Sequence, residues 1–338
     1  MNDNIPIPNY LDFLTDDFGV WQHANEKEIL TEEGYALDDS SRAMIVFILL
    51  KNVDKANVCL NYIEKSLKDG LFIGFFHADK TVRTYPASYD ATALAFWALA
   101  FAIQQNFQKE RCSHILSNIN LDFIIKQPYI RTKSYLLIGS SLLKNKTLSD
   151  TLAEEIMSAF SIKNTHSSDS DASGFYWFED KLTYANAILP YSLLVYLEEF
   201  THDKHISNNI KNIAFHSLET LENYMRIGII PAPVGNREWQ PINRITRDIY
   251  GQQPIDAGFM VIFLEKLYRI YKDETTLNKI QDWYSWFYGN NIFKKTLIRK
   301  TDFACADGID LVGIKNHYGA ESVIVFLWAN ILFNNLNI

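Results

Sequence analysis

The stretch SYDATALAFWALAFAI, residues 88 to 103, carries a single charged side chain, and that residue, Asp90, stands near its beginning. From residue 93 onward every position is apolar, so a helix formed here has no polar face to turn toward water. Such a helix must be covered on all sides, yet this apolar run is too short to span a bilayer. The stretch therefore predicts a helix buried inside a globular fold.

Similar apolar segments recur along the whole chain, and amphipathic segments lie between them. The apolar segments are expected near residues 40–53, 90–104, 133–143, 186–199, 256–271 and 320–333. The amphipathic segments are expected near residues 54–68, 108–125, 148–160, 206–226 and 275–288, and Tyr10 to Thr15 supply a twelfth helix. An inner ring of six buried helices wrapped by an outer ring satisfies this alternation. We therefore predict an all-α fold, an (α/α)6 toroid.

No linker rich in Pro, Ser or Gly divides the chain, so we expect residues 1–338 to form a single domain. The composition agrees with a helical fold, because 14 Gly and 9 Pro in 338 residues are few for a protein of many strands. The polar tract at residues 165–174 is expected to be a surface loop. The N-terminal residues resemble no signal peptide, and we expect a cytoplasmic protein that does not associate with membranes.

Charge and motifs exclude several classes of function. The net charge is −8 and no basic block occurs, so nucleic acid is not an expected partner. Three well-separated cysteines offer neither a disulfide framework nor a zinc pair, and they fit a reducing compartment. The chain contains no HExxH, GxxxxGK[ST], GxGxxG or GxSxG motif. We therefore expect neither a metal nor a cofactor.

Carboxylates introduce five of the six apolar segments. Each of them alone is explained by helix capping, since Asp and Ser are favoured N-caps and acids in a first turn complement the helix dipole. Capping does not require the aromatic and amide residues that surround them, however. The inner helices of a toroid run parallel, so their N-termini meet at one mouth, and acids, amides and rings gathered there are typical of a carbohydrate site. The predicted catalytic candidates are Asp39, Asp90, Asp180, Asp256 and Glu321.

Further residues of the same loops are predicted to bind a substrate. They are Trp21, His23, Tyr35, Asp38, Arg42, Tyr89, Trp177, Tyr184, Asn186, Trp239, Gln252, Gln253, Asp307 and His317. Five arginines near the mouth are expected either to meet an acidic sugar or to pair with the carboxylates: Arg42, Arg83, Arg237, Arg244 and Arg247.

Several of these segments together carry a resemblance. They are TDDFGVWQHA (15–24), GYALDDSSRA (34–43), SYDATALAFWAL (88–99), FEDKLTYANAILP (178–190), PVGN (233–236) with Trp239, QQPIDA (252–257), DGID (307–310) and GAES (319–322). In this order they resemble a bacterial family of helical, glycosidase-like proteins that stand alone or follow a glycosyltransferase domain. The resemblance implies a six-hairpin toroid that acts on an oligosaccharide or glycoconjugate, with a possible functional link to a glycosyltransferase, and it implies no particular substrate.

The chain departs from that family pattern at three places. The pattern Asp-Asp-Asn-Ala-Arg is replaced by Asp38-Asp39-Ser40-Ser41-Arg42, Ala185 stands where the family pattern has an acid, and the shorter Asp256 replaces the Glu of the pattern QQPIEA. Because the acid is absent at Ala185, Asp180 and Asp256 become the stronger candidates for a catalytic role.

Three functions remain open from the sequence. The first is an inverting glycoside hydrolase with two of the five candidate carboxylates, Asp39 as acid and Asp256 as base, since like-charge repulsion from Asp38 raises the pKa of Asp39. The second is a non-catalytic glycan-binding domain that serves a glycosyltransferase. The third is a sugar epimerase, which needs a general base such as His23 or His317 at the mouth.

Overall fold

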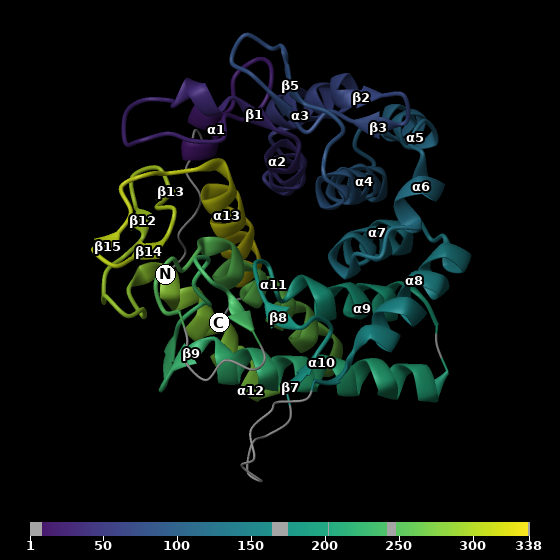
Figure 1. The fold of residues 1–338 in the computed structure, drawn as a ribbon, viewed down its shortest axis with the longest axis vertical. Helices are drawn as coiled ribbons and strands as arrows, with labels where there is room; N and C mark the ends of the chain where they lie inside the picture. Colours follow the sequence, from purple (N-terminus) through teal and green to yellow (C-terminus); the bar gives the residue numbers. More distant parts are fainter. Residues whose placement is uncertain (1–8, 164–174, 202, 242–247, 337–338) are drawn as a thin grey trace.

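Six helices form a closed inner ring in the computed structural model, which describes residues 9–163, 175–201, 203–241 and 248–336. The inner helices are α2 (Leu37–Leu49), α4 (Tyr89–Gln104), α7 (Ile130–Leu142), α9 (Ile188–Glu199), α11 (Pro254–Tyr271) and α13 (Ala320–Asn335). Each packs against the next in chain order, and α13 returns to α2 and closes the ring (Figure 1). The predicted (α/α)6 toroid is confirmed. The tract 165–174, Arg244 and Arg247 lie outside the described residues.

The outer helices pack behind the ring. They are α1 (Tyr10–Leu14), α3 (Val53–Ser66), α5 (Lys109–Ser117), α6 (Leu121–Ile125), α8 (Lys146–Ala159), α10 (Lys204–Tyr224) and α12 (Glu274–Ser285), with 3-10 turns η1 (Thr31–Glu33) and η2 (Trp286–Tyr288). The segment 108–125, predicted as one helix, is two, because Asn120 starts a new helix. Its side chain accepts a hydrogen bond from the Phe123 amide, while its own amide donates to Gly70 O at 2.8 Å.

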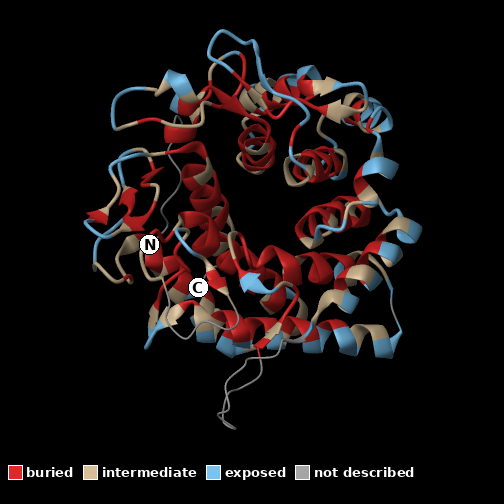
Figure 2. Cartoon of the chain, viewed as in Figure 1, coloured by how far each residue is buried: buried red, intermediate tan, exposed pale blue. Residues whose placement is uncertain are grey.

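The inner helices are buried on nearly every side, as their sequences require, and exposed residues concentrate on the outer ring (Figure 2). Aromatic rings fill part of the interior. The ring of Trp97 on α4 lies 5.9 Å from that of Tyr135 on α7 and 5.4 Å from that of Trp328 on α13. Gly139 lets α4 and α7 approach closely, since a Cβ there would lie 2.6 Å from the Phe96 ring. Packing of this kind fixes the inner helices relative to one another.

Short antiparallel strands occur in the connections that precede inner helices. β1 (Tyr35–Ala36), β4 (Phe75–Phe76) and β5 (Val82–Thr84) form a three-stranded sheet. The two-stranded pairs are β2 (Leu67–Lys68) with β3 (Leu71–Phe72), β6 (Ser161–Lys163) with β7 (Phe175–Trp177), β8 (Lys181–Leu182) with β11 (Gln240–Pro241), β9 (Arg226–Ile227) with β10 (Ile230–Pro231), β12 (Ile298–Arg299) with β13 (Ala304–Cys305) and β14 (Ile309–Asp310) with β15 (Gly313–Ile314). These paired segments stiffen the loops around the mouth of the ring. Among the described helices, none combines the length and the apolar character needed to cross a membrane.

Candidate active site

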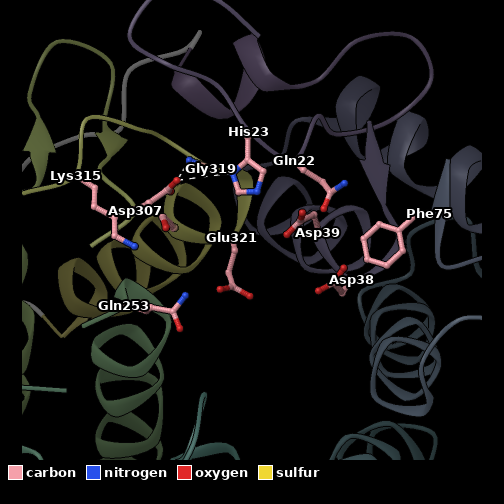
Figure 3. Close-up of a pocket in the computed structure, with 11 residues that line it drawn as sticks. Gln22, His23, Asp38, Asp39, Phe75, Gln253, Asp307, Lys315, Gly319 and Glu321 are labelled. Carbon is pink, nitrogen blue, oxygen red and sulfur yellow. Dashed lines mark hydrogen bonds and ion pairs between the residues drawn. The ribbon is translucent and has the colours of Figure 1, made fainter. Parts of the chain in front are cut away.

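The N-terminal ends of the inner helices surround a cavity with three adjoining lobes. The first lobe, about 270 Å³, is lined by residues that include His23, Asp38, Asp39, Gln253, Asp307 and Glu321 (Figure 3). The second, about 180 Å³, is lined by residues that include Arg42, Phe75, Asp90, Tyr135 and Tyr184. The third, about 240 Å³, is lined by Ser88, Tyr89, Asp90, Tyr129, Ile130, Arg131, Thr132 and Glu179. The first two share Asp38, Phe75 and Glu321, and the last two share Ser88 and Asp90.

A buried arginine gathers three carboxylates at the junction of the first two lobes. The Nη1 atom of Arg42 lies 3.4 Å from Asp38 Oδ2, 3.7 Å from Asp39 Oδ1 and 3.3 Å from Glu321 Oε2. Its side chain is only 4% exposed, and its Nε has no hydrogen-bond partner among the described residues. Asp38 and Asp39 lie in the first turn of α2 and Glu321 in the first turn of α13, so the contact between these two helices brings the three acids together.

Two of these carboxylates have a raised pKa. Burial is the main cause for Asp39, whose pKa lies well above its usual range, and the neighbouring charge of Asp38 adds to it. Burial also raises the pKa of Glu321, and Asp38 and Asp307 contribute, while Arg42 opposes the rise. The sequence predicted the repulsion from Asp38, but desolvation of Asp39 is the larger effect. Desolvated acids facing an open lobe are groups suited to proton transfer.

A histidine and an aspartate also line the first lobe, next to the N-terminal end of α13. His23 Nδ1 lies 3.7 Å from Asp307 Oδ2, and Asp307 Oδ1 accepts a hydrogen bond of 2.5 Å from the Gly319 amide. The interaction with Asp307 raises the pKa of His23 above its usual value. Gly319 permits this approach, since a Cβ there would lie 2.9 Å from Asp307 Oδ1 and 3.1 Å from His23 Nδ1. Figure 3 shows His23 and Glu321 directed toward the same open space.

Asp90 lies between the second and third lobes and is held through both of its oxygens. Thr132 Oγ1 donates to Asp90 Oδ1 at 2.5 Å, and Tyr184 OH donates to Asp90 Oδ2 at 2.7 Å. The hydroxyl of Tyr135 is also buried beside the second lobe and has no hydrogen-bond partner among the described residues. This part of the cavity therefore presents one fixed carboxylate and one unsatisfied hydroxyl.

A second polar cluster is buried beside the cavity. Asn186 donates two hydrogen bonds to Asp256 Oδ1, one from its backbone N–H at 3.1 Å and one from its side-chain Nδ2 at 3.0 Å. Asp256 Oδ2 has no partner among the described residues, and burial raises the pKa of Asp256 to about 7. Arg131 bonds Glu179, Thr183 and, at 3.5 Å, Asn186. Neither Asp256 nor Asn186 lines any of the three lobes.

Several other predicted residues lie outside the lobes. Asp180 and His317 are exposed, and the adjacent residue Glu179, rather than Asp180, reaches the third lobe. Gln252 is buried and bonds Ile249 and Trp286, whereas its neighbour Gln253 lines the first lobe. The remaining aromatic candidates belong to the packing behind the loops. They are Tyr35, whose hydroxyl donates to Asp16, Trp21, which packs on Tyr35 at 4.0 Å, buried Trp177, and Trp239, which lies 6.2 Å from Tyr184.

Some lining residues were not predicted from the sequence. Gln22, Phe75, Lys315, Gly319 and Ser322 line the first lobe, Tyr135 the second and Tyr129 the third. Most of them adjoin predicted residues in the same loops. The sequence therefore identified the loops that line the cavity, although not every residue in them. Tyr135 had no such signal, because α7 has no acid in its first turn. Among the described residues, no group of three or more His, Cys, Asp or Glu side chains is arranged to hold a metal ion.

Comparisons with known proteins place this geometry in a known architecture. No protein-family model and no curated protein sequence matches the chain. Similar solved structures include a sugar epimerase from a ruminal bacterium, with a TM-score of 0.70, 12% identity and coverage of 99% of this chain and 97% of that one. A cellobiose 2-epimerase from Bacillus thermoamylovorans has a TM-score of 0.70, 11% identity and coverage of 98% and 96%. An α-mannanase from Bacteroides thetaiotaomicron has a TM-score of 0.60, 11% identity and coverage of 97% and 94%. At these identities the similarity shows the shared six-hairpin fold.

Proposed function

We propose that this chain is a glycan-acting enzyme, a glycoside hydrolase in which Asp39 and Glu321 are the catalytic pair. The observation that carries the proposal is the contact of both carboxylates with the buried Arg42, at the N-terminal ends of two neighbouring inner helices and beside an open cavity. The similarity to sugar epimerases and to a mannanase supports a carbohydrate substrate, since this architecture serves several proteins that act on sugars.

The two carboxyl groups take different roles because their surroundings differ. Asp39 is buried and its pKa is raised well above the usual range, so it retains a proton and donates it to the leaving oxygen as the glycosidic C–O bond breaks. The pKa of Glu321, whose side chain is 35% exposed, is also raised by burial, but Arg42 opposes the rise and the shift is smaller than that of Asp39, so Glu321 is the member of the pair that ionises first. It takes a proton from a water molecule whose oxygen bonds to the anomeric carbon. The proposal thus replaces the predicted base Asp256, which lines none of the lobes.

The spacing of the pair bears on the stereochemistry. The two distances to the shared Nη1 atom, 3.7 and 3.3 Å, limit the separation of Asp39 Oδ1 and Glu321 Oε2 to about 7 Å. Inverting enzymes need about 6.5 to 9.5 Å, so that a water molecule fits between sugar and base, and retaining enzymes about 5 to 5.5 Å. The upper limit of about 7 Å admits the retaining distance and the lower end of the inverting range, so the spacing alone does not select between them. We propose inversion, and the anomer first released, followed by proton NMR, tests it.

Substitution of the pair tests the proposal directly. Asp39→Asn and Glu321→Gln are each expected to lower the release of reducing ends from aryl glycosides and from α- and β-linked gluco- and manno-oligosaccharides by at least about a hundredfold. Glu64→Gln, on the outer helix α3, is the matched control and is expected to turn over glycans as the unmodified protein does. Turnover that survives both active-site substitutions would falsify the assignment. Glycan binding without any turnover by the unmodified protein would identify it as an accessory binding domain instead.

A sugar epimerase or isomerase is the second candidate, and the His23–Asp307 pair favours it. His23 lines the same lobe as Glu321, and its pKa is raised by Asp307, so it is poised to move a proton next to a sugar carbonyl. Incubation with cellobiose or mannose in D2O distinguishes the two functions. Epimerisation of cellobiose incorporates deuterium at C2, and isomerisation of mannose to a ketose incorporates it at C1; neither releases new reducing ends, and His23→Asn should abolish both. Hydrolysis of cellobiose releases reducing ends, incorporates no deuterium on carbon and survives His23→Asn.

A further inference from the structure

Two tyrosines, Tyr89 and Tyr129, line the third lobe, and Phe123 packs on Tyr89 beside it. Tyr89 begins α4, Phe123 lies on α6 and Tyr129 immediately precedes α7, and these three residues are here called the aromatic platform. The ring of Tyr129 stacks on that of Tyr89 at 5.6 Å with an interplanar angle of 23°, and the ring of Phe123 lies 6.0 Å from Tyr89. The helices that carry the platform lie together on one side of the ring in Figure 1.

Two of the three platform side chains are too exposed to serve only as packing in the core. Tyr129 is 53% exposed and Phe123 is 42% exposed, although both are large apolar rings. An exposed group of apolar side chains beside a cavity commonly marks a ligand-binding surface. The flat faces of stacked tyrosines match the apolar faces of pyranose rings, which carry only C–H groups.

Polar groups complete the third lobe. Glu179 lines the lobe, and its Oε2 accepts a hydrogen bond of 2.8 Å from Arg131 Nη2. Arg131 itself is buried and held by Thr183 at 2.7 Å, so Glu179 has a fixed position. A sugar unit has both an apolar face and hydroxyl groups that donate hydrogen bonds. An aromatic surface next to a fixed hydrogen-bond acceptor therefore suits a sugar unit.

The third lobe adjoins the second, and the second adjoins the lobe of the proposed catalytic pair. Asp90 and Ser88 line both the second and the third lobe, whereas Asp39 and Glu321 lie in the first lobe and at its junction with the second. A ligand in the third lobe therefore lies beyond the units held on either side of the pair. We propose that the aromatic platform and Glu179 bind a further pyranose unit, so that the substrate is an oligosaccharide of at least three sugars. This inference rests on the proposed carbohydrate function.

A chain-length series tests the platform separately from catalysis. Glucose, mannose and their α- and β-linked di-, tri- and tetrasaccharides are titrated by calorimetry against Glu321→Gln protein, in which bound glycan is not consumed. We expect the trisaccharide of the preferred series to bind at least about fivefold more tightly than the disaccharide. Added in this background, Tyr129→Ala should remove that gain and leave mono- and disaccharide binding unchanged, while Tyr129→Phe should retain it because the ring remains.

Phe13→Ala provides the matched control. Phe13 is 44% exposed and packs on Tyr10 at 5.1 Å, but it lines none of the three lobes, so its loss should not alter binding at any length. The platform is refuted if Tyr129→Ala weakens all lengths equally, has no effect, or changes only the oligomeric state, or if no glycan binds. Chain-length-dependent binding by a protein that hydrolyses nothing would sustain the platform and overturn the hydrolase proposal, so the two failures are distinguishable.

Discussion

Replacement of Arg42 by methionine should destabilise the fold and make its stability depend strongly on pH. The substitution keeps much of the side-chain volume but removes the cation that three carboxylates share at 3.3 to 3.7 Å. Removal of one partner of a buried ion pair costs about 3 to 5 kcal/mol, because the remaining charge is left uncompensated. The burial of Asp39 places this site in that class, whereas the partial exposure of Asp38 and Glu321 reduces their share, since water screens them.

The sign of the pH dependence follows from the raised pKa values of Asp39 and Glu321. A carboxyl group whose pKa is raised by folding binds its proton more tightly in the folded state. Its contribution to stability is therefore complete below the unfolded pKa and is lost as the pH rises through the folded pKa. Without Arg42 both pKa values should rise further, so the stability lost by Arg42→Met should be small near pH 4 and should increase toward pH 7.

Urea unfolding followed by circular dichroism between pH 4 and pH 8 measures this difference. Arg111→Met is the matched control, because Arg111 pairs with Glu64 on the partly exposed outer surface and should cost at most about 1 kcal/mol at any of these pH values. The reasoning is refuted if Arg42→Met destabilises the protein no more than this control. It is also refuted if the loss of stability is the same at every pH.

Two further substitutions address the groups around the cavity. Asp256→Asn keeps an oxygen acceptor for Asn186 but cannot ionise. Because burial raises the pKa of Asp256 from 3.8 to about 7, the wild-type protein should lose up to about 4 kcal/mol of stability relative to this variant as the pH rises from 4 to 7. Urea-unfolding profiles of the two proteins that stay parallel over this pH range would contradict the prediction. Gly319→Ala places a Cβ 2.9 Å from Asp307 Oδ1 and 3.1 Å from His23 Nδ1, so it should separate this pair and lower the pKa of His23 toward its usual 6.5. NMR titration of the His23 ring measures that change, and an unaltered pKa would show that the pair tolerates the added methyl group.

The local pattern of the sequence predicted the elements of the fold because burial leaves a direct trace in composition. The start of α4 was placed within one residue, at Tyr89 rather than Asp90, and α13 begins at Ala320 as expected. The break between α5 and α6 was missed, because the cap at Asn120 depends on a contact with the distant Gly70 as well as on its own residue type. Periodicity records which side of a helix is covered, but it does not record a contact made across the chain.

The cavity was predicted only in part, for a related reason. Asp39, Asp90 and Glu321 line the cavity because they occupy first turns of inner helices that meet at one end of the ring. The sequence could not choose between adjacent residues of a loop, as the pair Asp180 and Glu179 illustrates. Which of two neighbours faces the cavity depends on the backbone path of the loop, and that path is set by pairings such as β8 with β11.

The sequence by itself therefore determined a ring of helix pairs and the end of that ring at which acids and aromatic residues collect. Both follow from local rules, since a helix without a polar face must be buried and helices running in the same direction present their first turns together. Only the tertiary structure decided that Arg42 would hold carboxylates from α2 and α13, that Asp256 would be enclosed with Asn186, and that Tyr135 would reach the cavity. Those outcomes depend on distances between residues far apart in the chain, which no local pattern contains.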